Sequence, residues 1–305
     1  MEYMLQAEGI TKRYSQHVAL SDVTLNIPVN SIYGLLGPNG AGKTTFIRII
    51  NQIIEADEGT INIEGTPLNP DHIAIIGYLP EERGLYKKMT VGEQLVYLGQ
   101  LRNMTRRDAI AQSKAWTKKL SIDDWWGKKV EDLSKGMAQK IQFIATVLNR
   151  PRLIILDEPF SGFDPVNANL IKDEILQLRD EGSTIIFSTH RMESVEQLCD
   201  HIALINRSKK IMEGSKAEIK NQYRSNTYIV EHSSELSASG TLFDILSTEP
   251  AENGLRRTTL RIPGTSSPNE LLRYLINETE VHGFTEKIPS INDIFISSVN
   301  GESHE

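Results

Sequence analysis

The stretch "GLLGPNGAGKTT", residues 34–45, combines the residue types that can hold a phosphate group. An apolar run before it predicts a strand, and the pattern after it predicts a helix. Glycines let backbone N–H groups turn toward one centre, a lysine can reach the β- and γ-phosphates, and a threonine hydroxyl can bind Mg²⁺. The motif G-x-x-x-x-G-K-[ST] is met by Gly37, Pro38, Asn39, Gly40, Ala41, Gly42, Lys43 and Thr44. Because the strand–loop–helix context is intact, we expect this loop to bind a nucleotide rather than form a chance glycine-rich turn.

Two carboxylates follow a second apolar run. The run Leu153–Leu156 predicts a buried strand, and Asp157 and Glu158 stand directly after it. At that place Asp157 can hold Mg²⁺ through water, and Glu158 can accept a proton from an attacking water. A strand that ends in Asp-Glu is also a common surface turn, so the functional interpretation depends on the phosphate loop earlier in the chain.

The segment "LSKGM", residues 133–137, predicts a second helix start. Ser134 is a favourable N-cap, and Gly136 leaves the backbone open to close approach. Apolar residues at spacings near 3.6 predict an amphipathic helix after it, through Met137, Ile141, Ile144, Ala145 and Leu148. Because helix N-termini attract anions, this is a second candidate anion site, separate from the phosphate loop.

The composition excludes several classes. The 305 residues suffice for about two domains, and the net charge of −7 provides no overall basic field for nucleic acid, which we do not expect as a partner. The sole cysteine, Cys199, rules out an intramolecular disulfide and fits a reducing cytosol. The N-terminus has no signal-peptide pattern, and the apolar runs are far shorter than the roughly 20 residues that span a bilayer. We therefore expect a chain that does not cross a membrane by itself.

The order of patterns predicts an α/β fold in two domains. Residues 31–36, 152–157 and 183–189 are typical of buried parallel strands, and residues 60–64 of a half-exposed antiparallel strand. The β signal vanishes between about 85 and 150, which indicates a helical insertion. We expect a first domain over 1–218 and a smaller α+β domain over 219–305. In the latter we expect a loop at 231–240, a strand at 255–262, a helix at 269–276 and a final helix capped by Ser290.

With "SGFD" at 161–164 and a strand that leads to His190, these motifs stand in the order of the ATP-binding cassette (ABC) family, which the chain resembles over residues 1 to about 215. The resemblance implies a phosphate-loop, RecA-like core with an antiparallel β subdomain and an inserted helical subdomain. It also implies a head-to-tail dimer that closes on two MgATP. The loop from Gly37 to Thr45 would then be the Walker A motif, and Asp157 the Walker B aspartate.

The resemblance assigns further roles. Glu158 is expected to be the general base, and His190 to lie near the γ-phosphate. Tyr14 is expected to stack on adenine, although an aromatic side chain near an N-terminal strand is also often plain packing. Ser134 and Gly136 would belong to the signature that caps the γ-phosphate of the partner copy's ATP, and Asp164 to the D-loop.

Two positions depart from the family pattern. Glu81 stands where glutamine is usual and is expected to contact Mg²⁺, the alternative being a solvated loop acid. Lys135 stands where the signature usually has glycine, and a cation at a helix N-terminus opposes the dipole by roughly 0.3–1 kcal/mol. Lys135 is expected either to face the partner-bound nucleotide or to remain solvated. Both departures, with "PSINDIF" near the C-terminus, resemble the branch of cassettes that serves separately encoded export permeases, including sodium-efflux-type exporters.

The sequence thus predicts an ATP-hydrolysing transporter subunit, peripheral on the cytoplasmic face of the membrane, whose partners are a membrane permease and a second copy of itself. We expect the permease to dock near residues 81–86. A non-transport cassette that acts on ribosomes or DNA is the alternative, but such proteins usually carry two cassettes or a long coiled-coil insertion, and neither is present. A phosphate-loop GTPase or kinase would leave "LSKGM" unexplained. For the C-terminal domain, a structural or dimer-supporting role is favoured over ligand sensing.

Overall fold

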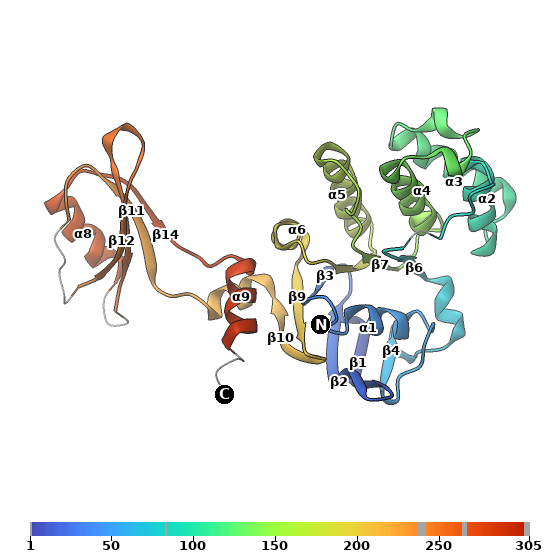
Figure 1. The fold of residues 1–305 in the computed structure, drawn as a ribbon, viewed down its shortest axis with the longest axis horizontal. Helices are drawn as coiled ribbons and strands as arrows, with labels where there is room; N and C mark the ends of the chain where they lie inside the picture. Colours follow the sequence, from blue (N-terminus) through green and yellow to red (C-terminus); the bar gives the residue numbers. More distant parts are fainter. Residues whose placement is uncertain (1, 83, 237–241, 264–266, 302–305) are drawn as a thin grey trace. The chain divides into compact units, whose positions relative to one another are not determined.

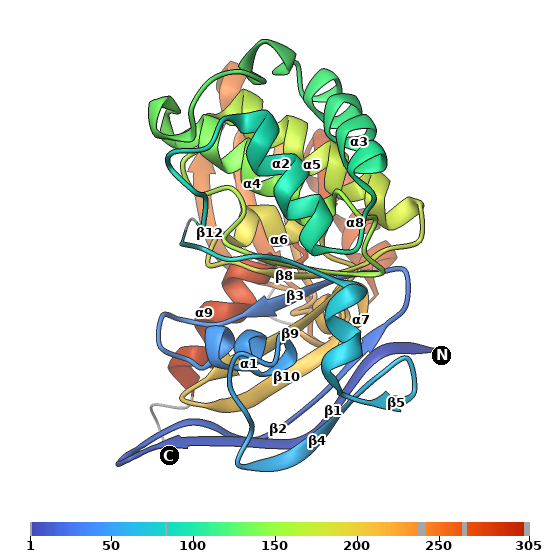
Figure 2. The same ribbon diagram turned by 90° about the vertical axis from the view of Figure 1, so that its right-hand side faces the viewer.

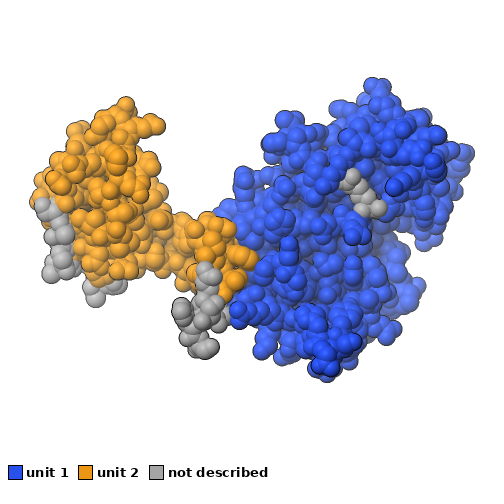
Figure 3. Space-filling model, in the orientation of Figure 1, with its two compact units in different colours: residues 1–216 blue, residues 217–305 orange. Residues whose placement is uncertain are grey.

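The computed structural model describes residues 2–82, 84–236, 242–263 and 267–301. The chain divides into two units, Met1–Lys216 and Ala217–Glu305, drawn in blue and orange in Figure 3. The division falls two residues before the expected boundary, within helix α7 (Lys216–Gln222). Part of the segment expected as a loop, residues 237–240, lies outside the described residues. Each unit is described by itself below.

A mostly parallel sheet forms the centre of the first unit. Its order is β10–β9–β3–β8–β7–β6. Strand β10 runs antiparallel to β9, and the other neighbouring strands pair in parallel. The three expected strands are confirmed with shifts of one residue at their ends. Their buried β-branched and leucine residues explain why the pattern was readable, since both faces of such a sheet are covered. The strands are β3 (Ile32–Leu36), β6 (Ile76–Leu79), β7 (Leu153–Asp157), β8 (Thr184–Ser188), β9 (His201–Asn206) and β10 (Lys209–Ser215).

Helix α1 (Lys43–Ile50) lies between the parallel sheet and a second, antiparallel sheet. The order of this second sheet is β2–β1–β4–β5 (Figure 2), with bounds Tyr3–Tyr14 for β1, His17–Pro28 for β2, Glu58–Ile63 for β4 and Thr66–Pro67 for β5. The expected strand at 60–64 is thus confirmed, but it begins and ends earlier. Phe46 and Ile50 of α1 share one core with Leu5 of β1 and Ile155 of β7. Helix α1 is therefore held in place by packing against both sheets.

The expected helical insertion is confirmed and lies beside the sheet's β6–β7 edge (Figure 1). It contains α2 (Val91–Leu101), α3 (Arg106–Lys119) and α4 (Lys135–Val147). Helices α5 (Pro165–Asp180) and α6 (Met192–Leu198) follow strands β7 and β8. Short 3₁₀ turns link the elements at Pro70–Ala74, Asp123–Trp125 and Val130–Asp132. Across the described residues, no helix combines the length and apolar composition that a bilayer crossing requires.

The second unit is an antiparallel sheet with helix α8 (Pro268–Glu278) packed on one face. The sheet order is β12–β13–β11–β14, with bounds Thr227–His232 (β11), Asp244–Pro250 (β12), Arg256–Arg261 (β13) and Val281–Glu286 (β14), and a 3₁₀ turn lies at Glu252–Gly254. The α+β expectation is confirmed, although the expected loop at 231–240 begins only after β11. Ser290 caps α9 (Ile291–Gly301) as expected, because its Oγ accepts from the Asp293 N–H at 3.1 Å.

Candidate nucleotide site

The glycines of the phosphate loop are required by its packing. Gly37 and Gly42 have φ of 150° and 112°, values that favour glycine. A Cβ at Gly37 would come within 2.1 Å of the Ile205 carbonyl oxygen, and one at Gly42 within 2.4 Å of the Ala19 oxygen. The loop therefore lies directly against β9 and β2. The first N–H groups of α1, which have no partner within a helix, are left at its open end.

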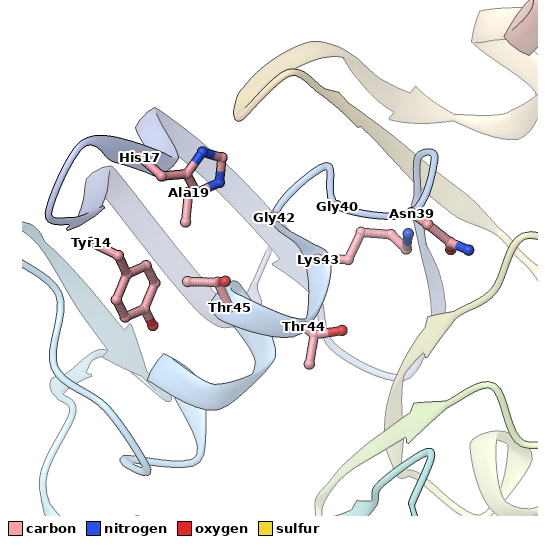
Figure 4. Close-up of a pocket in the computed structure, with 9 residues that line it drawn as sticks. All are labelled: Tyr14, His17, Ala19, Asn39, Gly40, Gly42, Lys43, Thr44 and Thr45. Atoms are coloured by element: carbon pink, nitrogen blue, oxygen red, sulfur yellow. The ribbon is translucent and has the colours of Figure 1, made fainter.

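A pocket of about 230 Å³ lies along this loop (Figure 4). Tyr14 and His17 lie at one end and Asn39 at the other, with Thr45 between them. Tyr14 is 44% exposed, so its ring is available to a ligand. The pocket is lined by Tyr14, His17, Ala19, Asn39, Gly40, Gly42, Lys43, Thr44 and Thr45. The arrangement offers an aromatic end for a flat base and an amide-rich end for phosphates.

Lys43 is buried at the phosphate end. Its Nζ donates to the carbonyl oxygens of Gly37 at 2.8 Å and Pro38 at 3.1 Å. Burial lowers the pKa of Lys43, whereas the carboxylates of Glu158, Asp157 and Glu81 act to raise it. This cation thus stands where negative charge from two strand ends converges.

Asp157, at the end of β7, is 3% exposed. Burial raises its pKa, and the carboxylates of Glu81 and Glu158 raise it further, while Lys43 acts to lower it. Glu81 is an exposed residue whose charge acts on both Asp157 and Lys43. Glu81 therefore lies close enough to the strand ends for its charge to act there, while the residue remains exposed to solvent.

The donor set fits Mg²⁺ bound together with a nucleotide. Carboxylate and hydroxyl oxygens are the ligands that Mg²⁺ prefers, and it usually takes only one or two from protein. In Figure 4 the hydroxyl of Thr44 and the side chain of Lys43 extend to the same side of the loop. Within the described ranges, no three acidic, histidine or cysteine side chains are grouped so that they could hold a metal ion by themselves.

Glu158 is held by the end of β8. Its backbone lies in the left-handed region, at φ 50°, and its N–H donates to the Ser188 oxygen at 2.9 Å. The carboxylate accepts from the Thr189 hydroxyl at 3.0 Å and from the His190 N–H at 2.8 Å, and it lies 2.7 Å from His190 Nδ1. Side-chain exposure is 14% for Glu158 and 62% for His190. The two residues therefore form a hydrogen-bonded pair in which His190 lies on the solvent side.

The signature residues lie apart from this pocket. Ser134 caps α4, its Oγ accepting from the Met137 N–H at 3.3 Å. Among the described residues, neither Ser134 nor Gly136 lines the phosphate-loop pocket. Gly136 instead faces the next loop, since a Cβ there would lie 3.2 Å from the Gly162 oxygen. The second candidate anion site, at the start of α4, therefore lies outside the phosphate-loop pocket.

The side chain of Asp164 caps the N-terminus of helix α5. Its carboxylate accepts from the Asn167 backbone N–H at 3.0 Å and from the Asn167 side chain at 2.5 Å, which lowers the pKa of Asp164. It begins α5 and fixes the end of the loop that starts after Glu158. Within its own copy, Asp164 therefore serves as the N-cap of α5.

Comparisons with known proteins agree with this arrangement. The family model described as "ABC transporter" matches residues 20–161, and one described as "ATP-binding protein DrrA1-3-like, C-terminal domain" matches residues 214–299. A Bacillus subtilis (strain 168) protein, "Uncharacterized ABC transporter ATP-binding protein YhaQ", is 40% identical over 97% of this chain and 98% of its own length. The chain belongs to the ABC transporter ATP-binding proteins.

Other members of the ABC family support this membership. The "ABC transporter ATP-binding protein NatA" of B. subtilis is 36% identical over 68% of this chain and 86% of its own length. The "Linearmycin resistance ATP-binding protein LnrL" of the same organism is 33% identical over 74% of each chain. Among solved structures, an "ATP binding subunit of ABC transporter" has a TM-score of 0.68 and 26% identity, covering 72% of this chain and 93% of that one. The expected ABC resemblance and fold are confirmed.

Two residues of this ABC site were missed from the sequence. His17 reaches the pocket because β1 and β2 form a hairpin that pairs it with Tyr14. Thr189 holds the Glu158 carboxylate from the end of the neighbouring strand. Both residues could have been found from their neighbours in the sequence. His17 follows Tyr14 closely across a turn, and Thr189 directly precedes His190.

The raised pKa of Asp157 predicts how a neutral side chain at this position changes stability. A carboxyl whose pKa is raised on folding stabilises the fold only while protonated, so this stability is lost as pH rises through the pKa of the folded state. Asp157→Asn should therefore raise the melting temperature of the nucleotide-free protein at pH 7, and reduce the further rise produced by MgATP. The exposed Asp124→Asn is the control and should change neither. A melting temperature for Asp157→Asn at or below that of the parent would contradict this reading.

Proposed function

We propose that this ATP-binding subunit of an ABC transporter hydrolyses MgATP to drive a separate membrane permease in export. The observation that carries the proposal is the group formed by Glu158, Thr189 and His190 beside the phosphate loop. Glu158 would take the proton of the attacking water, and His190 would orient the γ-phosphate. Lys43 would leave the loop carbonyls and neutralise phosphate charge.

The pocket supports the proposed positions of adenine and the phosphates. Adenine would stack on Tyr14, with the phosphates along the amide end of the loop between Gly37 and Thr45. Asp157, Glu81 and Thr44 would hold Mg²⁺, which would neutralise the negative charge of the phosphates. The Glu81 carboxylate would take the role that glutamine has in most of the family.

A second copy is needed to complete the site. Because Ser134 and Gly136 lie outside the pocket that the phosphate loop lines, they would cap the γ-phosphate bound by a partner copy. Asp164 would lie at the same interface, where it shapes the loop after Glu158. ATP would then join two copies head to tail, and hydrolysis would release them.

A groove supports the proposed permease contact. It has a volume of about 280 Å³ and lies between β6, α2 and α4. Its lining includes Pro80, Gly84 and Leu85, from the segment that follows β6. The Gln142 amide of α4 donates to the oxygens of Pro80 at 3.3 Å and Glu82 at 3.4 Å. A permease segment seated here would therefore touch the segment of Glu81 and the signature helix together, on the cytoplasmic face of the membrane.

Export is supported by the relatives. One relative is named as a linearmycin resistance ATP-binding protein, and residues 214–299 match the family model of a DrrA-like C-terminal domain. Those relatives are named as transport or resistance ATP-binding proteins, so the ribosome- or DNA-directed alternative finds no support among them.

The catalytic proposal is tested with Glu158→Gln. Loss of the general base should lower ATP turnover by about 10²–10⁴-fold, because that is the usual contribution of such a group. The variant should still bind MgATP and dimerise, which light scattering would show. The turnover of the purified parent is the reference. Near-normal turnover in Glu158→Gln would remove Glu158 from this role.

The docking proposal is tested with Leu85→Glu. A carboxylate in the apolar lining of the groove should disrupt co-purification with a permease from detergent-solubilised membranes, while ATP binding stays unchanged. Ile53→Glu is the matched control, because Ile53 is 58% exposed and lies outside the groove. Equal recovery of the permease with both variants would place the contact elsewhere.

A further inference from the structure

Lys135 packs through its carbon chain. A Cβ built on Gly162 would lie 3.0 Å from Cγ, Cδ and Cε of Lys135, so these three methylenes lie across the face of Gly162. Gly162 has φ 90° and offers its bare backbone to this contact. Long cationic side chains commonly bury such a stem while the charged end stays in water.

The ammonium group of Lys135 makes no comparable contact with the described residues of its own copy. Across the described part of the chain, no carboxylate forms an ion pair with its ammonium group, and the residue is exposed overall. The two expectations drawn from the sequence, a nucleotide-facing cation and a solvated lysine, both concern the charge. The observed contact concerns the stem.

The same loop is held by α4 at further points. The Gln139 amide, 2% exposed, donates to the Pro159 oxygen at 3.2 Å, and Gly136 lies against the Gly162 oxygen. At its beginning the loop is tied to Glu158, whose carbonyl accepts from the Ser161 N–H at 3.1 Å. Movement at Gly162 would therefore be transmitted to the backbone of Glu158, which is already in the left-handed region.

We infer that the aliphatic stem of Lys135, rather than its charge, holds the loop 159–164 and thereby positions Glu158. Lys135 is on this view a positioning residue, and the inference rests on the proposed role of Glu158 in hydrolysis. A side chain at this position thus supplies a contact that glycine, the usual residue of the family, cannot make.

The test compares Lys135→Ala with Lys135→Met. Alanine removes the stem and the charge, methionine removes the charge and keeps most of the stem, and both favour helices. Lys135→Ala should lower kcat about tenfold with the dissociation constant for ATP within about twofold of the parent, since a misplaced catalytic group costs rate rather than ground-state binding. Lys135→Met should restore kcat to near the parent value.

Hydrogen exchange gives a readout independent of turnover. Residues 159–164 should exchange faster in Lys135→Ala than in the parent, and at the parent rate in Lys135→Met. Melting curves of the two variants establish that both are folded. Equal losses of kcat in both variants, or a salt-dependent loss of ATP affinity in both, would show that the charge matters and overturn the inference. Unchanged kcat and exchange in Lys135→Ala would also overturn it. If the parent itself fails to hydrolyse ATP, the proposed function fails, while the exchange data still decide the role of the stem.

Discussion

The convergence of Asp157, Glu158 and Glu81 on the buried cation Lys43 is the constraint on which the site depends. Burial raises the pKa of Asp157, and the neighbouring carboxylates of Glu81 and Glu158 raise it further, while Lys43 acts to lower it. A buried carboxyl with a raised pKa reduces stability at pH values at which it is ionised, and in the proposed function a divalent cation would offset the excess negative charge. The fold tolerates it because α1 is fixed between two sheets and the glycines place the loop in direct contact with β2 and β9.

The proposal of a second copy follows from the separation between the helix tip and the phosphate loop. The phosphate loop gives amides and a lysine, and the strand ends give carboxylates, but the helix tip that begins at Ser134 belongs to a different part of the unit. Its loop contacts run instead to Gly162 and Pro159. The tip is thus structurally coupled to the loop after Glu158, so that capping a partner's nucleotide and aligning the copy's own general base would be linked events.

Much of the site was predictable because it rests on local patterns. The phosphate loop and the Asp157–Glu158 pair follow buried strands whose apolar runs are readable in the sequence. His17 was missed because the hairpin of β1 and β2 contains irregular register, which breaks the alternation that marks a strand. Strand β12 of the C-terminal sheet was missed because this edge strand is almost wholly exposed and carries little apolar signal. The contact of Lys135 with Gly162 depends on tertiary packing, which no local pattern encodes.

The central claim is that a phosphate loop in one copy and a serine-capped helix tip in another bind opposite sides of one triphosphate. An ATP analogue with a photoreactive group on its γ-phosphate tests it directly, in a mixture of isotope-labelled and unlabelled copies. The account predicts crosslinks that join the nucleotide held by the phosphate loop of one copy to residues 134–137 of the other. Crosslinks confined to the copy that binds the nucleotide, at saturating analogue and Mg²⁺, would contradict it.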